Sequence, residues 1–387
     1  MKQKLLDIIK KVPAGLRRAC FAVWVAGCVL LAIVTLFAGI GGMIDPRIIA
    51  IPAILAMSLP GWLGANVVTA IINLWVARRV SVVQWIVCLL SIGGFNAYCP
   101  LNVFHSEEVA PADSAFLFKV MTINTFGFHD DEDIYPDNTN RTASQIIHSG
   151  ADLVFVQEIG FLSDMPIRHL THEQIDSIGE IYPYTMFNDE KMVGILSRYP
   201  LTWVELPQPE QNYSGFEAAK LIVNDVELLA VSVHLQSLGL NEEDKLIFHQ
   251  MTSGDSDVSW RSGSRQLYRK VAGAMRQRAD QAALLEDALD GIDRQATLLA
   301  GDFNDINGCY AMRILGRQGL KDTYSAVGVG PVVTYHADRF YFNIDHIMFG
   351  GDIKPVDIRV GDIKSSDHYP VFATYLIPRH GASTHEK

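Results

Sequence analysis

The chain has few cysteines, and they are not spaced for a disulfide framework or a thiolate metal site. Five cysteines occur in 387 residues, and Cys309 is the only one after residue 99. No two of them have the C-x-x-C spacing that is typical of zinc sites and redox motifs. The sequence therefore argues against a structural zinc site and against a fold that depends on disulfides.

The first hundred residues are short of acidic side chains. They contain nine Lys or Arg residues and two Asp or Glu residues, whereas the other 287 residues contain 23 basic and 41 acidic residues. Three stretches contain no charged residue at all, namely 19–44, 48–77 and 80–101. A transmembrane helix needs about 20 apolar residues, so each stretch is long enough to cross a bilayer. The sequence predicts a membrane module of about three transmembrane helices over residues 1–101.

The second apolar stretch is interrupted by Pro52, Pro60 and Gly61, which predict a kink or a shortened span. A module with two spans, in which one stretch forms a re-entrant hairpin, is the main alternative. A cleaved signal peptide is a poor explanation of the first stretch, because its apolar run is longer than a signal peptide requires.

Basic residues flank the predicted spans unevenly. Six Lys or Arg residues precede the first span, and Arg78 and Arg79 lie between the second and the third, whereas the loop after the first span holds only Asp45 and Arg47. Basic loops tend to remain in the cytoplasm, which predicts a cytoplasmic N-terminus. With three spans, the chain would then emerge on the other side. We expect a multi-pass protein of the cell (inner) membrane with its acidic domain on the non-cytoplasmic side.

The rest of the chain is predicted to contain a linker over 102–115, an α/β domain over 116–378 and a tail over 379–387. Nine strands are predicted, over residues 116–123, 153–157, 194–197, 220–223, 227–233, 297–300, 342–349, 353–360 and 369–375. Three helices are predicted, over residues 142–148, 264–289 and 312–318. Many strands with few helices predict two packed sheets with helices outside. The polar stretch 238–262 is predicted to be a long loop, either functional or mobile.

Polar side chains lie at or near the ends of predicted strands in six places along the chain. These residues are Asn124, Glu158, His234, Asp302 with Asn304, Asp345, and Asp367 with His368. Each of them alone has an ordinary explanation as a turn former, a helix cap or a buried polar group. Six strand ends that carry only carboxylate, amide and imidazole groups are harder to explain by coincidence. We therefore predict that these strand ends converge on one functional site.

The chemistry of this set is narrow. Glu158, Asp302 and Asp367 offer hard oxygen ligands, and the absence of cysteine favours Mg²⁺ or Mn²⁺, with Ca²⁺ possible, over zinc. Such a set suits phosphoryl transfer, in which a cation and hydrogen-bond donors offset the charge of the phosphate while a base prepares water. Asp345 is the candidate partner that orients His368.

The motifs T-x-N, Q-E, S-R-Y-P, H-L, G-D-F-N, I-D-H-I and S-D-H-x-P follow one another along the chain. Together they resemble those of the endonuclease/exonuclease/phosphatase superfamily, which includes deoxyribonuclease I, abasic-site endonucleases, neutral sphingomyelinases and inositol polyphosphate 5-phosphatases. The resemblance covers about residues 117–376. It implies a four-layer α/β sandwich, in which two packed mixed β-sheets are flanked by helices, and the activity of a metal-dependent phosphoesterase.

The resemblance also implies separate roles for the site residues. Glu158 would bind the metal with help from Asn124, and Asp367 is grouped with them. The catalytic residues would be His368, Asp302, His234, Asn304 and Asp345. Among these, Asp302 and Asn304 would position the water and the phosphate, and His234 would contact the phosphate. Gln157 would support the site.

The predicted function is hydrolysis of a phosphodiester or phosphomonoester by a membrane-anchored domain. An endonuclease that acts on DNA is the alternative, although the charge of residues 101–387, about −18, disfavours avid binding of a polyanion. A non-catalytic binding domain of the same fold is a second alternative. The predicted partners are a lipid, small-molecule or nucleic-acid phosphate ester and the lipid bilayer, and no protein partner is predicted.

Overall fold

The computed structural model describes residues 13–102, 115–129, 139–159, 170–210, 213–241, 243–244, 246, 250, 260–337, 341–362 and 365–378. Contacts between residues divide the chain into two compact units. The first unit consists of Met1–Ile44 with Ile51–Phe95, and the second consists of Asp45–Ala50 with Asn96–Lys387. Most of the predicted loop 238–262 lies outside the described residues.

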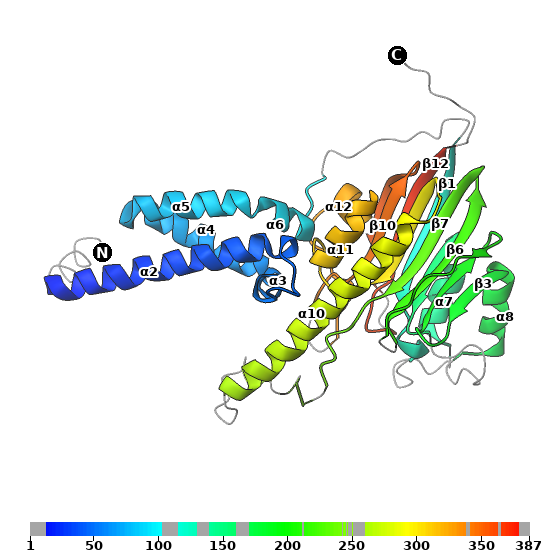
Figure 1. Ribbon diagram of the computed structural model, residues 1–387, viewed down its shortest axis with the longest axis horizontal. Coiled ribbons are helices and arrows are strands. Elements are labelled where there is room, and N and C mark those ends of the chain that lie inside the picture. The colour runs from blue at the N-terminus through cyan, green and yellow to red at the C-terminus, as the bar shows by residue number, and fades with distance from the viewer. Residues whose placement is uncertain are drawn as a thin grey trace, which may run out of the picture. The chain divides into compact units, whose positions relative to one another are not determined.

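The first unit is helical (Figure 1). Its elements are α2 (Ala14–Gly39), the short η1 (Gly41–Met43), α3 (Ile51–Ala56), α4 (Leu59–Val76), α5 (Arg78–Leu90) and α6 (Ile92–Tyr98), which continues past Phe95. By length and composition α2 and α4 can each cross a membrane. The pair α5 and α6 passes the same test together but is bent by 51° at its break, so this part of the chain offers two or three spans.

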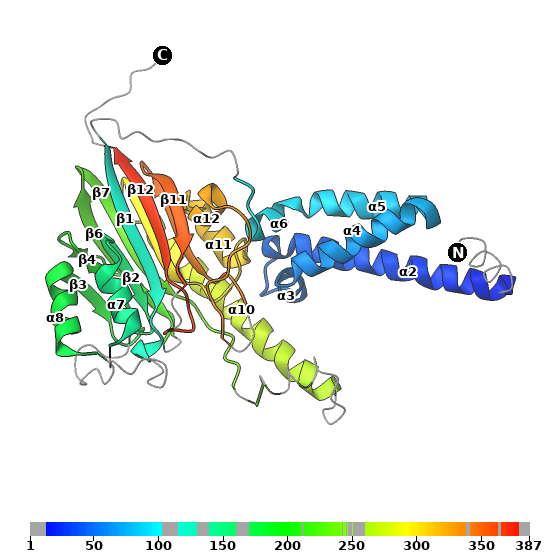
Figure 2. The same cartoon turned by 180° about the vertical axis from the view of Figure 1, so that it is seen from behind.

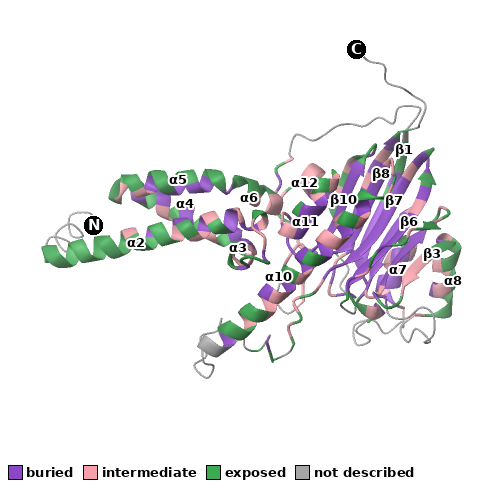
Figure 3. Cartoon of the chain, viewed as in Figure 1, coloured by how far each residue is buried: buried purple, intermediate pink, exposed green. Residues whose placement is uncertain are grey.

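The predicted interruption of the second apolar stretch is a break between α3 and α4. Pro60 lies in the first turn of α4, where its missing N–H removes no helical hydrogen bond. The helices of this unit leave large apolar side chains such as Leu30 and Trp75 exposed (Figure 3), 62% and 77% of their surface respectively. Continuous apolar exposure of this kind suits contact with lipid.

Buried amides join three helices of the first unit. The Asn73 side chain accepts a hydrogen bond from Trp24 Nε1 at 2.8 Å and donates one to Gln84 Oε1 at 2.8 Å. Gln84 in turn donates to Asn66 Oδ1 at 3.0 Å and to Thr69 Oγ1 at 2.7 Å. Because a buried amide without a partner is costly, this network specifies how α2, α4 and α5 pack.

Two six-stranded mixed sheets form the centre of the second unit (Figures 1 and 2). The first has the order β11-β12-β1-β2-β4-β3. Its strands are β1 (Ala115–Asn124), β2 (Leu153–Gln157), β3 (Tyr184–Asn188), β4 (Val193–Ser197), β11 (Lys354–Val360) and β12 (Val371–Pro378). The second has the order β5-β6-β7-β8-β10-β9. Its strands are β5 (Thr202–Trp203), β6 (Gly215–Val223), β7 (Val226–His234), β8 (Ala296–Asp302), β9 (Lys321–Asp322) and β10 (Asp345–Gly351).

The core between the sheets comes from alternate residues of the strands. Phe118 and Val120 of β1 share one buried cluster with Leu228 and Ala230 of β7 and with Leu298 of β8. Because side chains alternate across a strand, the residues between them face the outer layers. The two sheets therefore pack face to face through aliphatic side chains.

Helices cover the outer faces of both sheets. Figure 2 shows α7 (Arg141–His148) and α8 (His172–Ile181) on the first sheet, where Ala143 and Ile146 pack against Val154 and Val156. Figure 1 shows α10 (Trp260–Asp290) and α11 (Tyr310–Leu315) on the side of the second sheet, while η3 (Gly316–Gln318) follows α11 and α12 (Thr323–Val327) contacts β10 and β11. The predicted four-layer α/β sandwich is confirmed.

Candidate active site

Three of the predicted site residues lie side by side at the ends of neighbouring strands. His234 ends β7, Asp302 ends β8 and Asp345 begins β10. His234 is paired with Asp302 in the parallel ladder of β7 and β8, and Asp302 is paired with Asp345 in the antiparallel ladder of β8 and β10. Paired residues project from the same face of a sheet, so strand register alone brings these three together.

The first sheet contributes Asn124 from the end of β1 and Glu158 directly after β2. Asn124 Nδ2 donates to Asp302 Oδ2 at 3.0 Å and to Glu158 Oε1 at 3.1 Å. Its Oδ1 accepts a hydrogen bond from the backbone N–H of Phe126 at 3.0 Å. Asn124 therefore links the two sheets and orients one carboxylate from each.

The backbone is strained at two of these positions. Glu158 has φ 49° and Asn304 has φ 52°, both in the left-handed region. A residue with a Cβ pays about 1–2 kcal/mol to adopt this conformation. The left-handed conformation allows sharp turns directly after β2 and β8, and these turns expose the side chains of the strand ends. Backbone strain of this kind is typical of functional sites.

Asp345 and His368 form a buried pair. Asp345 Oδ2 lies 2.8 Å from His368 Nδ1, and His368 Nε2 lies 3.7 Å from Asp302 Oδ2 on its other side. Burial opposes the charged imidazolium, but the charges of Asp345 and Asp302 raise the pKa of His368 to about 10. Burial raises the pKa of Asp302, and the charge of Asp345 adds to this.

Asp367 lies at the edge of the same group. One of its carboxylate oxygens is 4.0 Å from His368 Nε2. Burial raises the pKa of Asp367 to about 6, and the carboxylates of Glu158 and Asp302 act in the same direction. Like charges have therefore been gathered into one small region.

His234 is buried between two carboxylates. Its Nε2 lies 3.7 Å from Glu158 Oε1 and 3.8 Å from Asp302 Oδ2. Neither ring nitrogen has a hydrogen-bond partner in the described part of the chain. Buried polar atoms are nearly always paired, so two open imidazole nitrogens point to a missing ligand or substrate.

The donor set fits a divalent cation. Ligand atoms of Glu158, His234 and Asp302 lie within 4.8 Å of one another, as do those of Asp302, Asp345 and His368. Over the described ranges, no Lys or Arg forms an ion pair with these carboxylates. Sites in which carboxylates outnumber the positively charged groups are the kind that bind Mg²⁺ or Mn²⁺.

Gln157 and Asn304 lie behind the charged groups. Gln157 is fully buried, accepts a hydrogen bond from Thr122 Oγ1 at 3.3 Å and donates one to Ser232 Oγ of the other sheet at 3.2 Å. Asn304 donates through Nδ2 to the carbonyl of Leu235 at 2.9 Å, and its N–H donates to Asp302 Oδ1 at 2.7 Å. Every predicted site residue thus lies in or directly beside one cluster.

Ser366 is a contributor that the sequence reasoning missed, although it stands inside the quoted S-D-H-x-P motif. Its hydroxyl donates to the carbonyl of Asn124 at 2.8 Å and accepts from the N–H of His368 at 3.1 Å. It therefore ties the His368 loop to β1.

Arg278 and Gln281 of α10 were also missed, because the sequence analysis assigned no site residue to this helix. Arg278 is fully buried and donates from Nε to Asp305 Oδ2 at 3.1 Å and from Nη1 to the carbonyl of Gln236 at 3.0 Å. Gln281 Oε1 accepts from the N–H of Gln236 at 2.9 Å. These contacts fix the chain that follows His234. A signal existed, since Arg278 falls at helical spacing within the apolar stripe of Met275 and Ala282.

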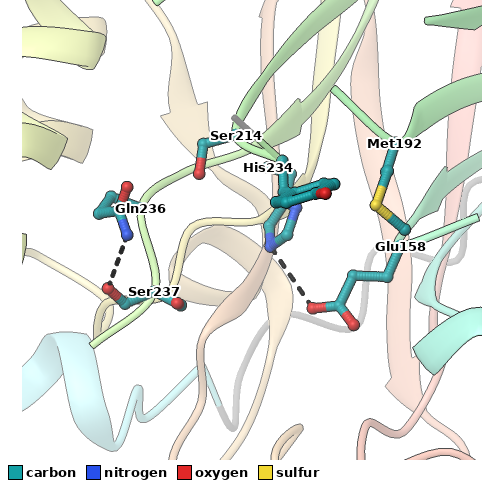
Figure 4. Close-up of a pocket in the computed structure, with 7 residues that line it drawn as sticks. Glu158, Met192, Ser214, His234, Gln236 and Ser237 are labelled. Atoms are coloured by element: carbon teal, nitrogen blue, oxygen red, sulfur yellow. Dashed lines mark hydrogen bonds and ion pairs between the residues drawn. The ribbon is translucent and has the colours of Figure 1, made fainter. Parts of the chain in front are cut away.

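A cavity of about 380 Å³ opens beside Glu158 and His234 (Figure 4). Its lining consists of Glu158, Met192, Tyr213, Ser214, His234, Gln236 and Ser237. Figure 4 shows His234 and Glu158 directed toward one another at the cavity, with Gln236 and Ser237 on the other side of His234. We call this the side cavity.

Comparison with known proteins gives one family match. A sequence profile described as the Endonuclease/Exonuclease/phosphatase family matches residues 121–368, which is more than half of the chain. The matched range contains every predicted site residue from Asn124 to His368. No curated protein sequence matches the chain.

Solved structures with a similar arrangement have low sequence identity. Truncated TDP2 from Caenorhabditis elegans has 16% identity and a TM-score of 0.46, covering 67% of this chain and 97% of its own. A protein named endonuclease/exonuclease/phosphatase from Beutenbergia cavernae has 17% identity and a TM-score of 0.44, covering 68% and 72%. Sphingomyelinase C from Streptomyces griseocarneus has 17% identity and a TM-score of 0.41, covering 67% and 99%. The family assignment rests on residues 121–368 and not on these likenesses.

Proposed function

The chain belongs to the endonuclease/exonuclease/phosphatase family, and on that premise we propose that it is a metal-dependent phosphoesterase that hydrolyses a phosphodiester or a phosphomonoester. The observation that carries this proposal is the convergence of Glu158, Asp302 and the Asp345–His368 pair around His234, whose ring nitrogens have no hydrogen-bond partner in the described chain. This arrangement combines cation ligands, a charged imidazole and an open hydrogen-bonding group in one place.

Glu158 and Asp302 would hold the cation, with Asp367 at the edge of the site. Asn124 helps by donating to both principal carboxylates and fixing their orientation. Mg²⁺ and Mn²⁺ match the oxygen donors best, and Ca²⁺ accepts the same ligand type. When bound, such a cation offsets the charge of the phosphate oxygens.

The remaining residues would handle the phosphate and the proton. His234 would donate a hydrogen bond to a phosphate oxygen from one of its two ring nitrogens, neither of which has a hydrogen-bond partner among the described residues. Asp302 would orient the attacking water, and His368, held by Asp345, would stabilise the negative charge that develops. Asn304 would keep the end of β7, and thereby His234, in register through its bond to Leu235.

The N-terminal helices would anchor this chemistry to a membrane. In the proposed organisation, residues 1–101 form three spans in the cell (inner) membrane, and 102–115 link them to a catalytic domain over 116–378. The basic residues Arg78 and Arg79 support a cytoplasmic N-terminus and a catalytic domain on the non-cytoplasmic side.

The test is an assay of the purified full chain in detergent with Mg²⁺ or Mn²⁺. Bis-p-nitrophenyl phosphate, sphingomyelin, phosphoinositides and plasmid DNA cover the candidate substrates. We expect hydrolysis of at least one phosphate ester, loss of activity in a chelator and recovery when the cation returns. Cleavage of DNA alone would favour the endonuclease alternative, and activity on none of the substrates would overturn the proposal.

Two variants test the site assignment. Glu158→Gln and His368→Ala should each lower kcat at least about 100-fold, because removal of one group that stabilises transition-state charge typically costs that much. Glu180→Gln on the exposed face of α8 is the matched control and should leave activity unchanged. Full activity in both site variants would show that the site is elsewhere.

A further inference from the structure

The side cavity is the feature of the molecule that can distinguish one phosphate ester from another. It shares Glu158 and His234 with the site, so a phosphate held there would place one of its ester groups in or beside the cavity. A volume of about 380 Å³ is near the small end of the range for ligand pockets. It accommodates a single small group and not a stretch of duplex.

The lining of the side cavity consists mainly of neutral polar side chains. Ser214, Ser237 and Tyr213 supply hydroxyl groups, and Gln236 supplies an amide. Met192 is the apolar contribution, and Glu158 is the carboxylate. Among the described residues that line this cavity there is no Lys or Arg. Hydroxyl and amide groups that can both donate and accept are suited to alcohols.

Lys191 directly precedes the lining residue Met192 in the sequence, but its ammonium group bonds to a carbonyl outside the lining. Its ammonium group donates to the carbonyl of Pro209 at 2.7 Å, and only 6% of the residue is exposed. Its stem lies against Gly215, where an added Cβ would come within 2.6 Å of Lys191 Cγ. The side chain is therefore held in place and does not supply a positive charge to the lining.

The net negative charge of the surrounding domain also disfavours a second anion at the side cavity. Residues 101–387 contain 23 basic and 41 acidic residues, and Glu158, Asp302 and Asp367 are concentrated at the site itself. A second negative group on the substrate would meet this acidic field, and no Lys or Arg of the described lining would pair with it. Binding sites for polyanions instead present Arg and Lys.

We propose that the side cavity receives an uncharged, hydroxyl-bearing ester group of a phosphodiester and discriminates against the same group when it carries an additional anion. This inference rests on the proposed function and names the substrate class for that site. The lining hydroxyl and amide groups recognise the alcohol, and the acidic surroundings, with no Lys or Arg among the described lining residues, disfavour the second anion.

The experiment uses the full chain in detergent with Mg²⁺ and two matched soluble substrates. One is the p-nitrophenyl phosphodiester of glycerol, and the other is the p-nitrophenyl phosphodiester of glycerol that carries a terminal sulfate. Release of p-nitrophenol reports cleavage of the same bond in both, and bis-p-nitrophenyl phosphate serves as the reference. We expect kcat/KM to favour the uncharged substrate by at least about tenfold at low salt, because like charges close to one another in a partly buried site repel strongly.

A pair of variants separates charge from bulk. Ser237 is exposed on the cavity wall, so replacement by a longer side chain is compatible with folding. Ser237→Lys should reduce the preference for the uncharged substrate about tenfold relative to Ser237→Gln, which adds length without charge.

Each outcome has a distinct meaning. A preference that Lys reduces and Gln preserves supports the inference. Equal or reversed preference, with bis-p-nitrophenyl phosphate hydrolysed, overturns the inference and leaves the proposed phosphoesterase in place. Failure to hydrolyse any of the three substrates overturns the proposed function, and the inference falls with it.

Discussion

Arg278→Met removes the guanidinium that joins α10 to the chain around the site. The native side chain is fully buried and makes two charge-assisted hydrogen bonds, at 3.1 Å to Asp305 and 3.0 Å to the carbonyl of Gln236. Methionine fills a similar volume but leaves the Asp305 carboxylate buried without its cation. Breaking a buried ion pair by removing one partner costs about 3–5 kcal/mol, and we expect a loss of this size in the free energy of unfolding.

The measurement is urea unfolding of the full chain in detergent, followed by pulse proteolysis of the second unit. Arg269→Met is the matched control on the same helix, because Arg269 is exposed and should change stability by less than about 0.5 kcal/mol. Adding Asp305→Asn to Arg278→Met removes the unpaired charge and should recover part of the loss. The reasoning is refuted if Arg278→Met is within about 1 kcal/mol of the native chain, or if the double variant is no more stable than the single one.

Three further substitutions test other parts of the structure. Gln84→Leu in the first unit removes its hydrogen bonds to the buried amides of α4 and should lower thermal stability in detergent by about 1–2 kcal/mol. Gly301→Ala should lower the free energy of unfolding by at least about 2 kcal/mol and misplace Asp302. Gly301 has a φ of 149°, and an added Cβ would lie 1.9 Å from the carbonyl oxygen of Val233. Gly291→Ala, whose added Cβ would meet no close atom, serves as the control in the same unfolding assay. Burial raises the pKa of Glu217, so folding disfavours the charged form of this carboxyl group. The stability that the neutral carboxyl group contributes is complete at low pH and declines as the pH rises above the ordinary pKa range of glutamate. Glu217→Gln should therefore stabilise the protein at pH 7 but not near pH 4 in the same unfolding measurement.

The strand ends with Asn124, Glu158, His234 and Asp302 could be predicted because each one combines two local signals. A short apolar run marks a buried strand, and a polar side chain directly after it marks where the strand leaves the core. Asp302 after Leu298–Gly301 and His234 after Val231–Val233 both follow this rule. Local sequence signals do not reveal strand register. The register pairs His234 with Asp302 and Asp302 with Asp345, and this pairing brings the three residues into one site.

The elements that were missed have weaker local signals. β3 has no buried residue, which is expected of an edge strand, and β5 and β9 are each two residues long. α8 was missed although Thr171 and Gln174 form a capping box at its start, a signal that the sequence does contain. β10 begins at Asp345 and not at residue 342, because Phe342 pairs instead with Tyr335.

The side cavity could not be predicted, for a different reason. Met192, Ser214 and Gln236 come from three separate connections, and none of them stands in a pattern that sets it apart from other loop residues. Their positions depend on the strands that precede or follow them and, for Gln236, on Arg278 and Gln281 of a helix more than forty residues away. Specificity of this kind is a property of tertiary packing.

The polar contacts behind the site suggest how the charged groups are held before any ligand arrives. Glu158, Asp302 and Asp367 repel one another, so the carboxylates do not keep themselves together. Burial raises the pKa of Asp367, and this repulsion acts in the same direction. Neutral side chains hold the carboxylates in place instead. Asn124 bonds to Asp302 across the two sheets, Gln157 bonds to Ser232 of the second sheet, and Ser366 joins the His368 loop to β1. Because these groups need no cation, the contacts that hold the backbone around the site would be the same with and without the proposed metal ion. The energy of binding can then offset the repulsion between carboxylates without also having to order the loops that carry them.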